Sequence, residues 1–293
     1  MREAALGIED DAGSWREPVR LGGLVRAGMQ LYLRALRLRF QLWRRLRPGT
    51  SFSDYYAFRV QRKLAEGGVH PTLGRNRWSP GEFRWYGAGA LAFLVSHGLE
   101  RHHRCIEYGC GSLRVGQHLI RYLDAGRYTG LDVTDRFFLD GLDLLEPELQ
   151  EQKRPRLALI TSAGLAELGR HPADFLVSIE VLQHVEPREL DAFLASLLQL
   201  VGPETRAFVS FREWKQPLQT AEKSWSRPAR ELAERIARIA PGARLEVVRG
   251  EWVKRSWDPS RKSILCIQRP AAAAHGPSSG AEDAKGSNPC PSI

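Results

Sequence analysis

The sequence predicts an α/β fold, in which a doubly wound sheet of seven strands follows a helical N-terminal extension. Three observations support this prediction. Apolar, strand-like runs alternate with helical stretches from about residue 104 to 211, the pattern of a parallel sheet with crossover helices. A glycine turn follows the first run, and an acid ends the second. The last two runs have only a loop between them, so we expect an antiparallel hairpin at one sheet edge.

The predicted strands and helices are short and alternate regularly. The strands fall at about 104–108, 127–132, 156–161, 173–179, 205–211, 243–250 and 262–269. The helices that accompany them fall at about 113–124, 135–149, 164–169, 187–200 and 225–239. Ligands of open α/β sheets bind at the carboxyl ends of the strands, so candidate site residues are sought there.

Composition divides the chain into four parts. Residues 1–17 are a polar leader, and residues 18–66 are a basic, amphipathic helical extension. Residues 67–269 form the main domain, with a loop at 67–81, a cap helix at 83–99 and a core at 103–269. Pro, Ala, Ser and Gly dominate residues 270–293, which predicts a disordered tail.

The positive charge is concentrated near the N-terminus. Residues 1–100 carry 16 Lys/Arg and 9 Asp/Glu, a net charge of +7, whereas residues 101–293 carry 27 and 25, a net charge of +2. The nearly neutral core argues against nucleic acid as a partner. The four cysteines show neither Cys-x-x-Cys nor zinc spacing, so we expect a cytoplasmic protein without a bound metal.

An arginine-striped helix is predicted from residue 24 to about 47. Six polar residues share one strip of its helical wheel: Arg26, Gln30, Arg34, Arg37, Gln41 and Arg44. Apolar residues fill the remainder, interrupted by Arg39. Three interpretations are open: packing on its own core or on a homodimer partner, peripheral contact with the inner membrane face, and contact with nucleic acid, which the neutral core disfavours.

The chemistry-bearing motif is a strand, a glycine turn and a second strand that ends in an acid. Glu107 lies in the first strand, Gly109-Cys110-Gly111 forms the turn, and Asp132 ends the next strand. Glycines let the backbone approach a ligand closely, and an acid at this point can bind two ribose hydroxyls. The spacing predicts a nucleoside cofactor.

The motif formed by Glu107, the 109–111 turn and Asp132 is followed by residues 174–187, which supply a further strand and a short turn. Together these segments resemble the class I S-adenosylmethionine-dependent methyltransferases. The resemblance covers about residues 78–269, and the run 109–116 (GCGSLRVG) is similar to a bacterial subgroup with undefined or glycan-related acceptors. It implies a Rossmann-like fold and S-adenosylmethionine as cofactor. One departure is Leu113, which stands where the family often has a third glycine.

The resemblance implies a role for each matching residue. Glu107 and the backbone of Gly109, Cys110 and Gly111 would hold the amino-acid end of the cofactor. Asp132 would bind the ribose, Val133 would lie beside the adenine, and Ser162 and Ala163 would lie at its edge, although no acid occurs there. Ile179 and Glu180 would face the sulfonium and the acceptor.

Two residues are candidate catalytic groups, and each has a structural alternative. His184 is a candidate general base, because an imidazole can take a proton near neutral pH. It is equally suited to cap the turn after the fourth strand. Glu180 is suited to pair with the acceptor or with an arginine.

The sequence thus predicts an S-adenosylmethionine-dependent methyltransferase that O-methylates a sugar, a glycan or another hydroxylated small molecule. Two alternatives are a nucleotide-cofactor oxidoreductase on a Rossmann-type fold and a non-catalytic S-adenosylmethionine-binding scaffold. We expect the acceptor to contact the helix that carries Trp85 and Tyr86, the turn at 180–184 and the loops at 212–224 and 251–261.

Overall fold

The computed structural model describes residues 23–65, 80–221, 223–249 and 261–269. The predicted leader (1–17) and tail (270–293) lie outside these residues. So do nearly all of the loops predicted at 67–81 and 251–261.

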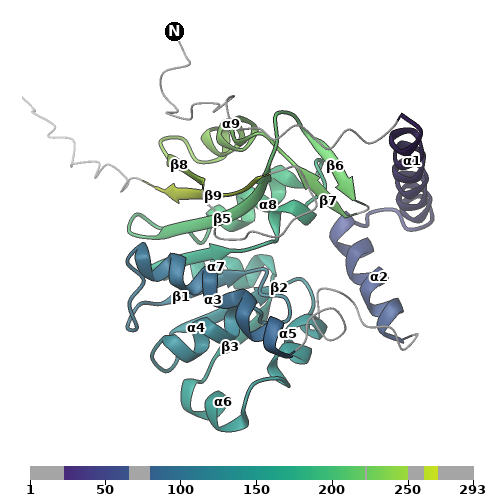
Figure 1. Ribbon diagram of the computed structural model, residues 1–293. Helices are drawn as coiled ribbons and strands as arrows, with labels where there is room; N and C mark the ends of the chain where they lie inside the picture. The colour runs from purple at the N-terminus through teal and green to yellow at the C-terminus, as the bar shows by residue number, and fades with distance from the viewer. Residues whose placement is uncertain (1–22, 66–79, 222, 250–260, 270–293) are drawn as a thin grey trace, which may run out of the picture.

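A seven-stranded sheet forms the centre of the molecule, with the strand order β3-β2-β1-β4-β5-β9-β8 (Figure 1). Its strands are β1 (Cys105–Tyr108), β2 (Tyr128–Asp132), β3 (Arg156–Leu159), β4 (Phe175–Ser178), β5 (Arg206–Glu213), β8 (Arg244–Arg249) and β9 (Arg261–Gln268). The first five strands pair in parallel, whereas β9 pairs antiparallel with both β5 and β8. The predicted Rossmann-like sheet with an antiparallel closing hairpin is confirmed.

Helices cover both faces of this sheet. One face carries α3 (Pro80–Ser96), α4 (Gly116–Tyr122) and α5 (Asp135–Leu142), and the other carries α7 (Ser162–Arg170), α8 (Leu190–Leu198) and α9 (Ala229–Ile239). Neighbouring strand residues point to opposite faces, so Val177 packs with the first group and Leu176 with the second. Two buried apolar clusters therefore hold the layers together and fix the strand ends that form the site.

The helix predicted at 135–149 is wrong, because the chain forms two helices there. The first, α5, ends at Leu142, and α6 (Pro147–Lys153) begins at a proline. A proline inside a helix lacks a backbone N–H and clashes with the carbonyl four residues earlier, but it is well placed in the first turn. Pro147 thus separates the two helices.

The loop predicted at 212–224 is also wrong in part. Arg212 and Glu213 belong to β5, and β6 (Leu218–Ala221) and β7 (Ser224–Ser226) form a second, two-stranded antiparallel sheet. Glu213 is buried at the end of β5, where its carboxylate pairs with Arg249 at 2.8 Å and accepts a hydrogen bond from Ser263 at 2.7 Å. These contacts join β5, β8 and β9.

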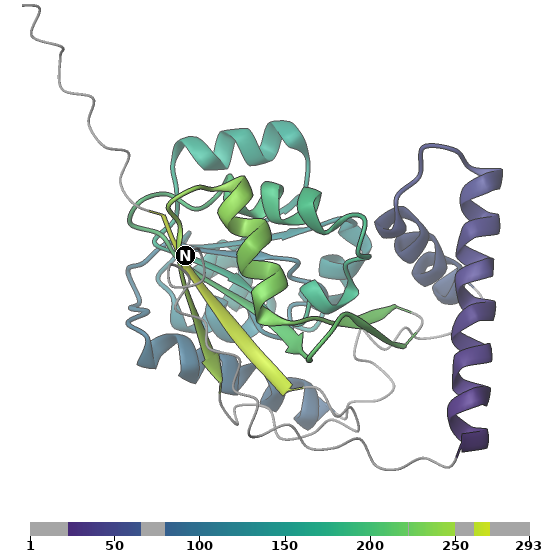
Figure 2. The same ribbon diagram turned by 90° about the horizontal axis from the view of Figure 1, so that it is seen from above.

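Two helices precede the sheet domain. α1 (Gly23–Leu46) lies along one side of the molecule, and α2 (Phe52–Ala65) lies between it and the sheet domain (Figure 2). Phe40 and Trp43 of α1 contact Tyr55 of α2, with ring centroids 5.2 Å apart in both pairs. Phe52 in turn contacts Trp225 of β7 at 5.1 Å. Aromatic side chains therefore connect the extension to the sheet domain.

Candidate functional site

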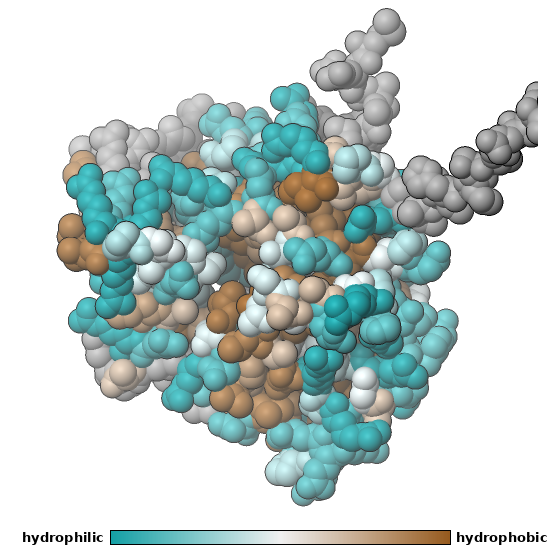
Figure 3. Space-filling model, turned by 180° about the vertical axis from the view of Figure 1, so that it is seen from behind, coloured by the Kyte–Doolittle hydropathy of each residue, from teal (hydrophilic) through white to brown (hydrophobic). Residues whose placement is uncertain are grey.

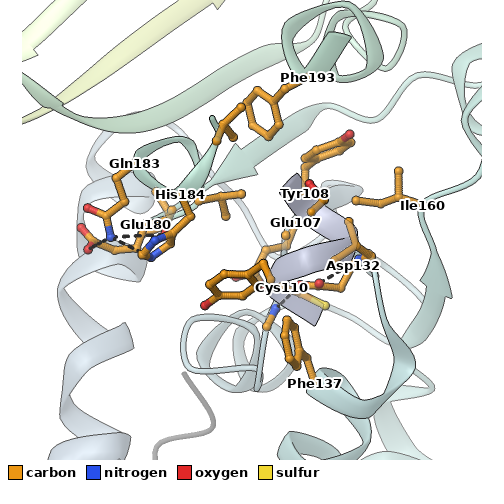
Figure 4. A pocket seen from close by; sticks show the side chains of 18 of the residues that line it. Glu107, Tyr108, Cys110, Asp132, Phe137, Ile160, Glu180, Gln183, His184 and Phe193 are labelled. Carbon is orange, nitrogen blue, oxygen red and sulfur yellow. Dashed lines mark hydrogen bonds between the residues drawn. The ribbon is translucent and has the colours of Figure 1, made fainter. Parts of the chain in front are cut away.

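A pocket of about 370 Å³ lies at the carboxyl ends of β1, β2, β3 and β4. This volume is in the range of small-molecule sites. Glu107 and Asp132 lie at one end of the pocket, and Glu180, Gln183 and His184 lie at the other (Figure 4). A parallel sheet brings these residues together from distant parts of the sequence because its strands end at the same edge.

Asp132 ties the glycine turn to the end of β2. Its Oδ2 accepts a hydrogen bond from the Gly111 N–H at 2.7 Å, and its Oδ1 accepts one from the Val133 N–H at 2.8 Å. Burial raises the pKa of Asp132 to about 6, although these backbone donors oppose the rise. The Thr134 N–H is a third backbone donor to this carboxylate, which leaves about one of its four acceptor sites for a ligand.

The two glycines of the turn serve different contacts. Both have a positive φ, +82° at Gly109 and +53° at Gly111, where other residues are strained. A Cβ on Gly109 would lie 2.5 Å from Cγ2 of Val181, so close packing requires this glycine. A Cβ on Gly111 would meet no atom within 4 Å and would occupy space at the pocket.

Leu113 takes a third positive φ, +59°, and its side chain is fully buried. The backbone at this position thus has the conformation that a glycine adopts most easily. Leucine accepts the strain, which costs about 1–2 kcal/mol, and fills the space beneath the turn with apolar contacts.

Glu107 is a buried acid at the floor of the pocket. Its Oε2 accepts a hydrogen bond from the Tyr128 hydroxyl at 2.6 Å. Burial raises the pKa of Glu107 to about 8, Tyr128 and Arg114 oppose the rise, and Asp132 adds to it. This carboxyl is therefore largely protonated near neutral pH, even with Arg114 nearby.

Glu180 stands at the opposite end of the pocket, just after β4. Its backbone is strained, with φ at +61°, and its N–H donates to Ser210 Oγ at 2.6 Å. Burial raises the pKa of Glu180, but Lys262, 3.0 Å away, and Arg212 outweigh burial and lower it overall. Glu180 is therefore an ionised carboxylate that is paired with Lys262.

His184 lies in the short 3-10 turn η3 (Leu182–His184) and lines the pocket. Its Nδ1 hydrogen-bonds to the Lys223 carbonyl oxygen, which can only accept, so Nδ1 carries the proton. Burial lowers the pKa of His184, the Lys223 carbonyl and Glu180 partly oppose that shift, and the charges of Arg212 and Lys223 add to it. A neutral ring of this tautomer presents Nε2 as a proton acceptor, 3.3 Å from Gln183 Nε2. The contact with Lys223 joins η3 to the residue that precedes β7, so His184 has a structural role but does not cap its own turn.

Helix α2 forms part of the pocket wall, which the sequence does not predict. Ser53 and Tyr56 line the pocket, and the Tyr56 ring lies 5.8 Å from that of His184 and 6.2 Å from that of Phe137. A carboxylate oxygen of Glu189 accepts a hydrogen bond from the Phe52 N–H and holds the start of the helix. No local pattern in residues 52–65 signals these contacts, because they join elements far apart in the sequence.

Most of the residues that the sequence predicts for the site line this pocket. They are Glu107, Gly109, Cys110, Gly111, Asp132, Val133, Ile179, Glu180 and His184. Ser162 and Ala163 do not line it, because they form the exposed first turn of α7, and Ile160 lines the pocket after β3. Within the described ranges, no cluster of three or more His, Cys, Asp or Glu side chains is arranged to hold a metal ion.

Arg114 and Phe193 also line the pocket, and the sequence does not single them out. Arg114 follows the glycine turn directly, so its place in the motif is the one signal that could have indicated it. Phe193 lies on α8 and contacts Tyr108 with ring centroids 5.5 Å apart. From the sequence alone, Phe193 is expected to be a core residue, because aromatic residues at helical spacing usually pack in the core.

Comparisons with solved structures find similar folds at low identity. Magnesium protoporphyrin IX methyltransferase from Synechocystis PCC 6803, with bound S-adenosylmethionine, is 16% identical, with a TM-score of 0.48 over 78% of this chain and 90% of that one. A Burkholderia thailandensis 1,6-didemethyltoxoflavin-N1-methyltransferase is 19% identical, with a TM-score of 0.49 over 77% and 92%. A TehB-like methyltransferase from Corynebacterium glutamicum ATCC 13032 is 17% identical, with a TM-score of 0.42 over 74% and 97%. No protein-family model and no curated protein matches the chain.

Proposed function

We propose that this protein is an S-adenosylmethionine-dependent methyltransferase. The observation that carries the proposal is the joint placement of Glu107, the 109–111 turn and Asp132 on one pocket. An acid at the end of β2 and an open glycine beside it suit a ribose, and a buried acid at the end of β1 suits an ammonium group.

The residues of the pocket fit the two ends of this cofactor. Asp132 would accept a hydrogen bond from a ribose hydroxyl, and Gly111 leaves the space that a close ligand requires. Glu107 would hold the ammonium group and Arg114 the carboxylate of the amino-acid end, since both line the same part of the pocket. Val133 and Ile160 would enclose the adenine.

When bound, S-adenosylmethionine supplies an electrophilic methyl group. The chain itself has to orient an acceptor, exclude water and take up any proton that the acceptor loses. Orientation alone can contribute roughly 7–11 kcal/mol to lowering the barrier. The pocket would enclose such a ligand between the carboxyl ends of the strands and α2.

We propose further that the acceptor is a hydroxylated small molecule, such as a sugar or a glycan, that is methylated on oxygen. His184 supports this proposal because a neutral imidazole with an accepting Nε2 can take a hydroxyl proton, which contributes about 10²- to 10⁴-fold to such reactions. Tyr56 and Phe137 offer aromatic walls for the face of a sugar ring. Glu180 is already paired with Lys262 and would position its neighbours rather than take the proton.

Isothermal titration calorimetry with S-adenosylmethionine tests the cofactor. We expect the wild-type chain to bind and Asp132→Ala to bind at least about tenfold more weakly, because a hydrogen bond between the ribose and a charged group is lost. Asp124→Asn is the matched control, since Asp124 is an exposed acid that pairs with Arg101. Unchanged affinity in Asp132→Ala would contradict the proposed site.

Two further measurements separate the alternatives. A nicotinamide dinucleotide that binds in place of S-adenosylmethionine would indicate the oxidoreductase. Transfer of a radiolabelled methyl group to a mixture of hydroxylated acceptors tests the enzyme, and we expect His184→Asn to abolish most of the transfer without weakening cofactor binding. Cofactor binding without transfer to any cellular extract would indicate a scaffold.

A further inference from the structure

Helix α1 carries an apolar stripe on its outer surface. Leu31, Leu38, Leu42 and Leu46 are 69%, 64%, 59% and 75% exposed. With the exposed Ala35, they recur at steps of three and four residues, so they share one face of the helix. Large aliphatic side chains exposed in a continuous row are uncommon on a soluble surface and mark an interaction site.

The stripe faces away from the rest of the protein. Phe40 and Trp43 occupy the inner face of α1 and pack on α2. In two views α1 is the outermost helix on its side of the molecule (Figures 1 and 2). Seen from behind, the edge formed by α1 shows hydrophobic and hydrophilic side chains next to each other (Figure 3).

Arginines flank the stripe on both sides. On a helical wheel Arg39 falls on one side and Arg45 on the other, and both are exposed. Arg44 and Arg47 are exposed as well, and each lies over an aromatic ring of the extension. Residues 18–53 contain no acid, so nothing within this segment neutralises the positive charge.

We propose that α1 docks the protein on an anionic lipid surface. Leucines would enter the boundary of the acyl chains, and the flanking arginines would lie at the level of the phosphates, which is how interfacial amphipathic helices bind. Among the described residues no helix is long and apolar enough to cross a membrane, so α1 would lie in the plane of the interface.

Two other occupants fit this surface less well. A second copy of the chain would bring two acid-free, arginine-rich helices together, and their like charges would repel each other. A nucleic acid would neutralise the arginines but would leave the exposed leucines in water. An anionic bilayer satisfies both the charge and the apolar stripe.

Co-sedimentation of the full chain with lipid vesicles tests the inference. Vesicles of phosphatidylcholine alone are compared with vesicles that also contain phosphatidylglycerol. We expect binding to the anionic vesicles to be stronger by about tenfold and to weaken with salt. The double variant Leu38→Gln/Leu42→Gln and the double variant Arg39→Gln/Arg45→Gln should each lower this binding by about tenfold.

Exposed residues elsewhere provide the matched controls. Leu139→Gln/Leu144→Gln and Arg230→Gln/Arg238→Gln make the same changes outside α1 and should bind as the wild type does. Circular dichroism establishes that each variant is folded. No cofactor is needed, so the result is independent of methyl transfer.

Three outcomes would overturn the inference. The first is equal sedimentation of the wild type and the α1 leucine variant with anionic vesicles. The second is a dimer in vesicle-free solution that the leucine variant converts to a monomer, because the stripe would then be a contact between copies. The third is a salt-sensitive shift of a short RNA that the arginine variant abolishes and the leucine variant does not.

Discussion

At the scale of single residues, Glu107 couples the stability of the protein to pH. Its pKa is about 8 in the folded chain, against an ordinary value of 4.5, so the native state binds more protons than the unfolded state between these values. Stability therefore falls as pH rises through this window. Asp132, raised to about 6, acts in the same direction at lower pH.

We expect Glu107→Gln to remove most of this dependence between pH 6 and 8. The variant should be more stable than the wild type at pH 8, by on the order of a few kcal/mol, because no carboxylate that is ionised in the unfolded chain has to lose its charge or be buried on folding. Urea unfolding across this range, without cofactor, measures the difference. Glu204→Gln, at an exposed position, should follow the wild type, and parallel curves for Glu107→Gln and the wild type would contradict the assignment.

His184 should be neutral at pH 7, with the proton on Nδ1. Burial lowers its pKa, and the Lys223 carbonyl fixes the tautomer. Long-range proton–nitrogen NMR spectra distinguish the two nitrogens, and His184→Asn assigns the signals. A ring that titrates above pH 6.5 would contradict the lowered pKa, and a neutral ring that is protonated on Nε2 would rule out Nε2 as the proton acceptor.

Some site residues could be predicted from the sequence and others could not. Glu107 and Asp132 are indicated by a local pattern, in which each acid lies in or at the end of an apolar run beside a glycine turn. Tyr56 reaches the pocket only because α2 packs against β7 and α8, contacts that join residues more than a hundred positions apart. The resemblance to methyltransferases predicts Ser162 and Ala163 at the edge of the adenine, but these residues form the first turn of α7 and do not line the pocket.

At the scale of elements, a buried ion pair fastens the antiparallel edge of the sheet. Arg249 of β8 donates to both carboxylate oxygens of Glu213 of β5 at 2.8 and 3.0 Å, and Ser263 of β9 donates to the same group. Glu213→Ala should cost about 3 kcal/mol, at the low end for breaking a buried pair, because Arg249 keeps some contact with water.

Equilibrium unfolding in urea measures this cost. Glu213→Gln should be milder, because the amide oxygen still accepts the hydrogen bond from Ser263. Glu234→Ala breaks an exposed pair with Arg230 and should cost less than about 1 kcal/mol. Equal effects at positions 213 and 234 would mean that the buried pair does not stabilise the sheet edge.

The elements that the sequence predicts correctly are those with local signals. Alternating apolar runs and helical periods place all seven strands of the main sheet to within a few residues. Pro147 is itself a local signal against one continuous helix at 135–149, since proline is unfavourable inside a helix. The β6–β7 hairpin had none, because no glycine or asparagine marks its turn and its strands are short.

At the scale of the whole molecule, a ligand held between α2 and the carboxyl ends of the strands should stabilise both parts. At about 100 times its Kd, a cofactor that binds only the folded state adds about 2.7 kcal/mol. For a domain of this size that raises the Tm by roughly 5–10 °C. Differential scanning fluorimetry with S-adenosylmethionine tests the expectation. Absence of a shift at saturating cofactor, or an equal shift in Asp132→Ala, would contradict it.

The basic N-terminal part of the chain and the nearly neutral remainder occupy different parts of the molecule. The first 100 residues carry a net charge of +7, and α1 places part of that charge at the outer edge of the molecule. Residues 101–293 are almost neutral and supply all seven strands of the main sheet, while α2 adds Ser53 and Tyr56 to the pocket wall. None of the α1 side chains that the structure describes lines the pocket, so their charge lies outside the site.

The two glycines of the 109–111 turn differ in how much space a side chain would find at each position. Gly109 is required by the chain's own packing against Val181, whereas the space beside Gly111 is required only by a ligand. A side chain at 111 would bear only the strain of a positive φ, whereas a side chain at 109 would also collide with Val181. In a chain whose pocket holds no ligand, substitutions should therefore be tolerated better at position 111 than at position 109.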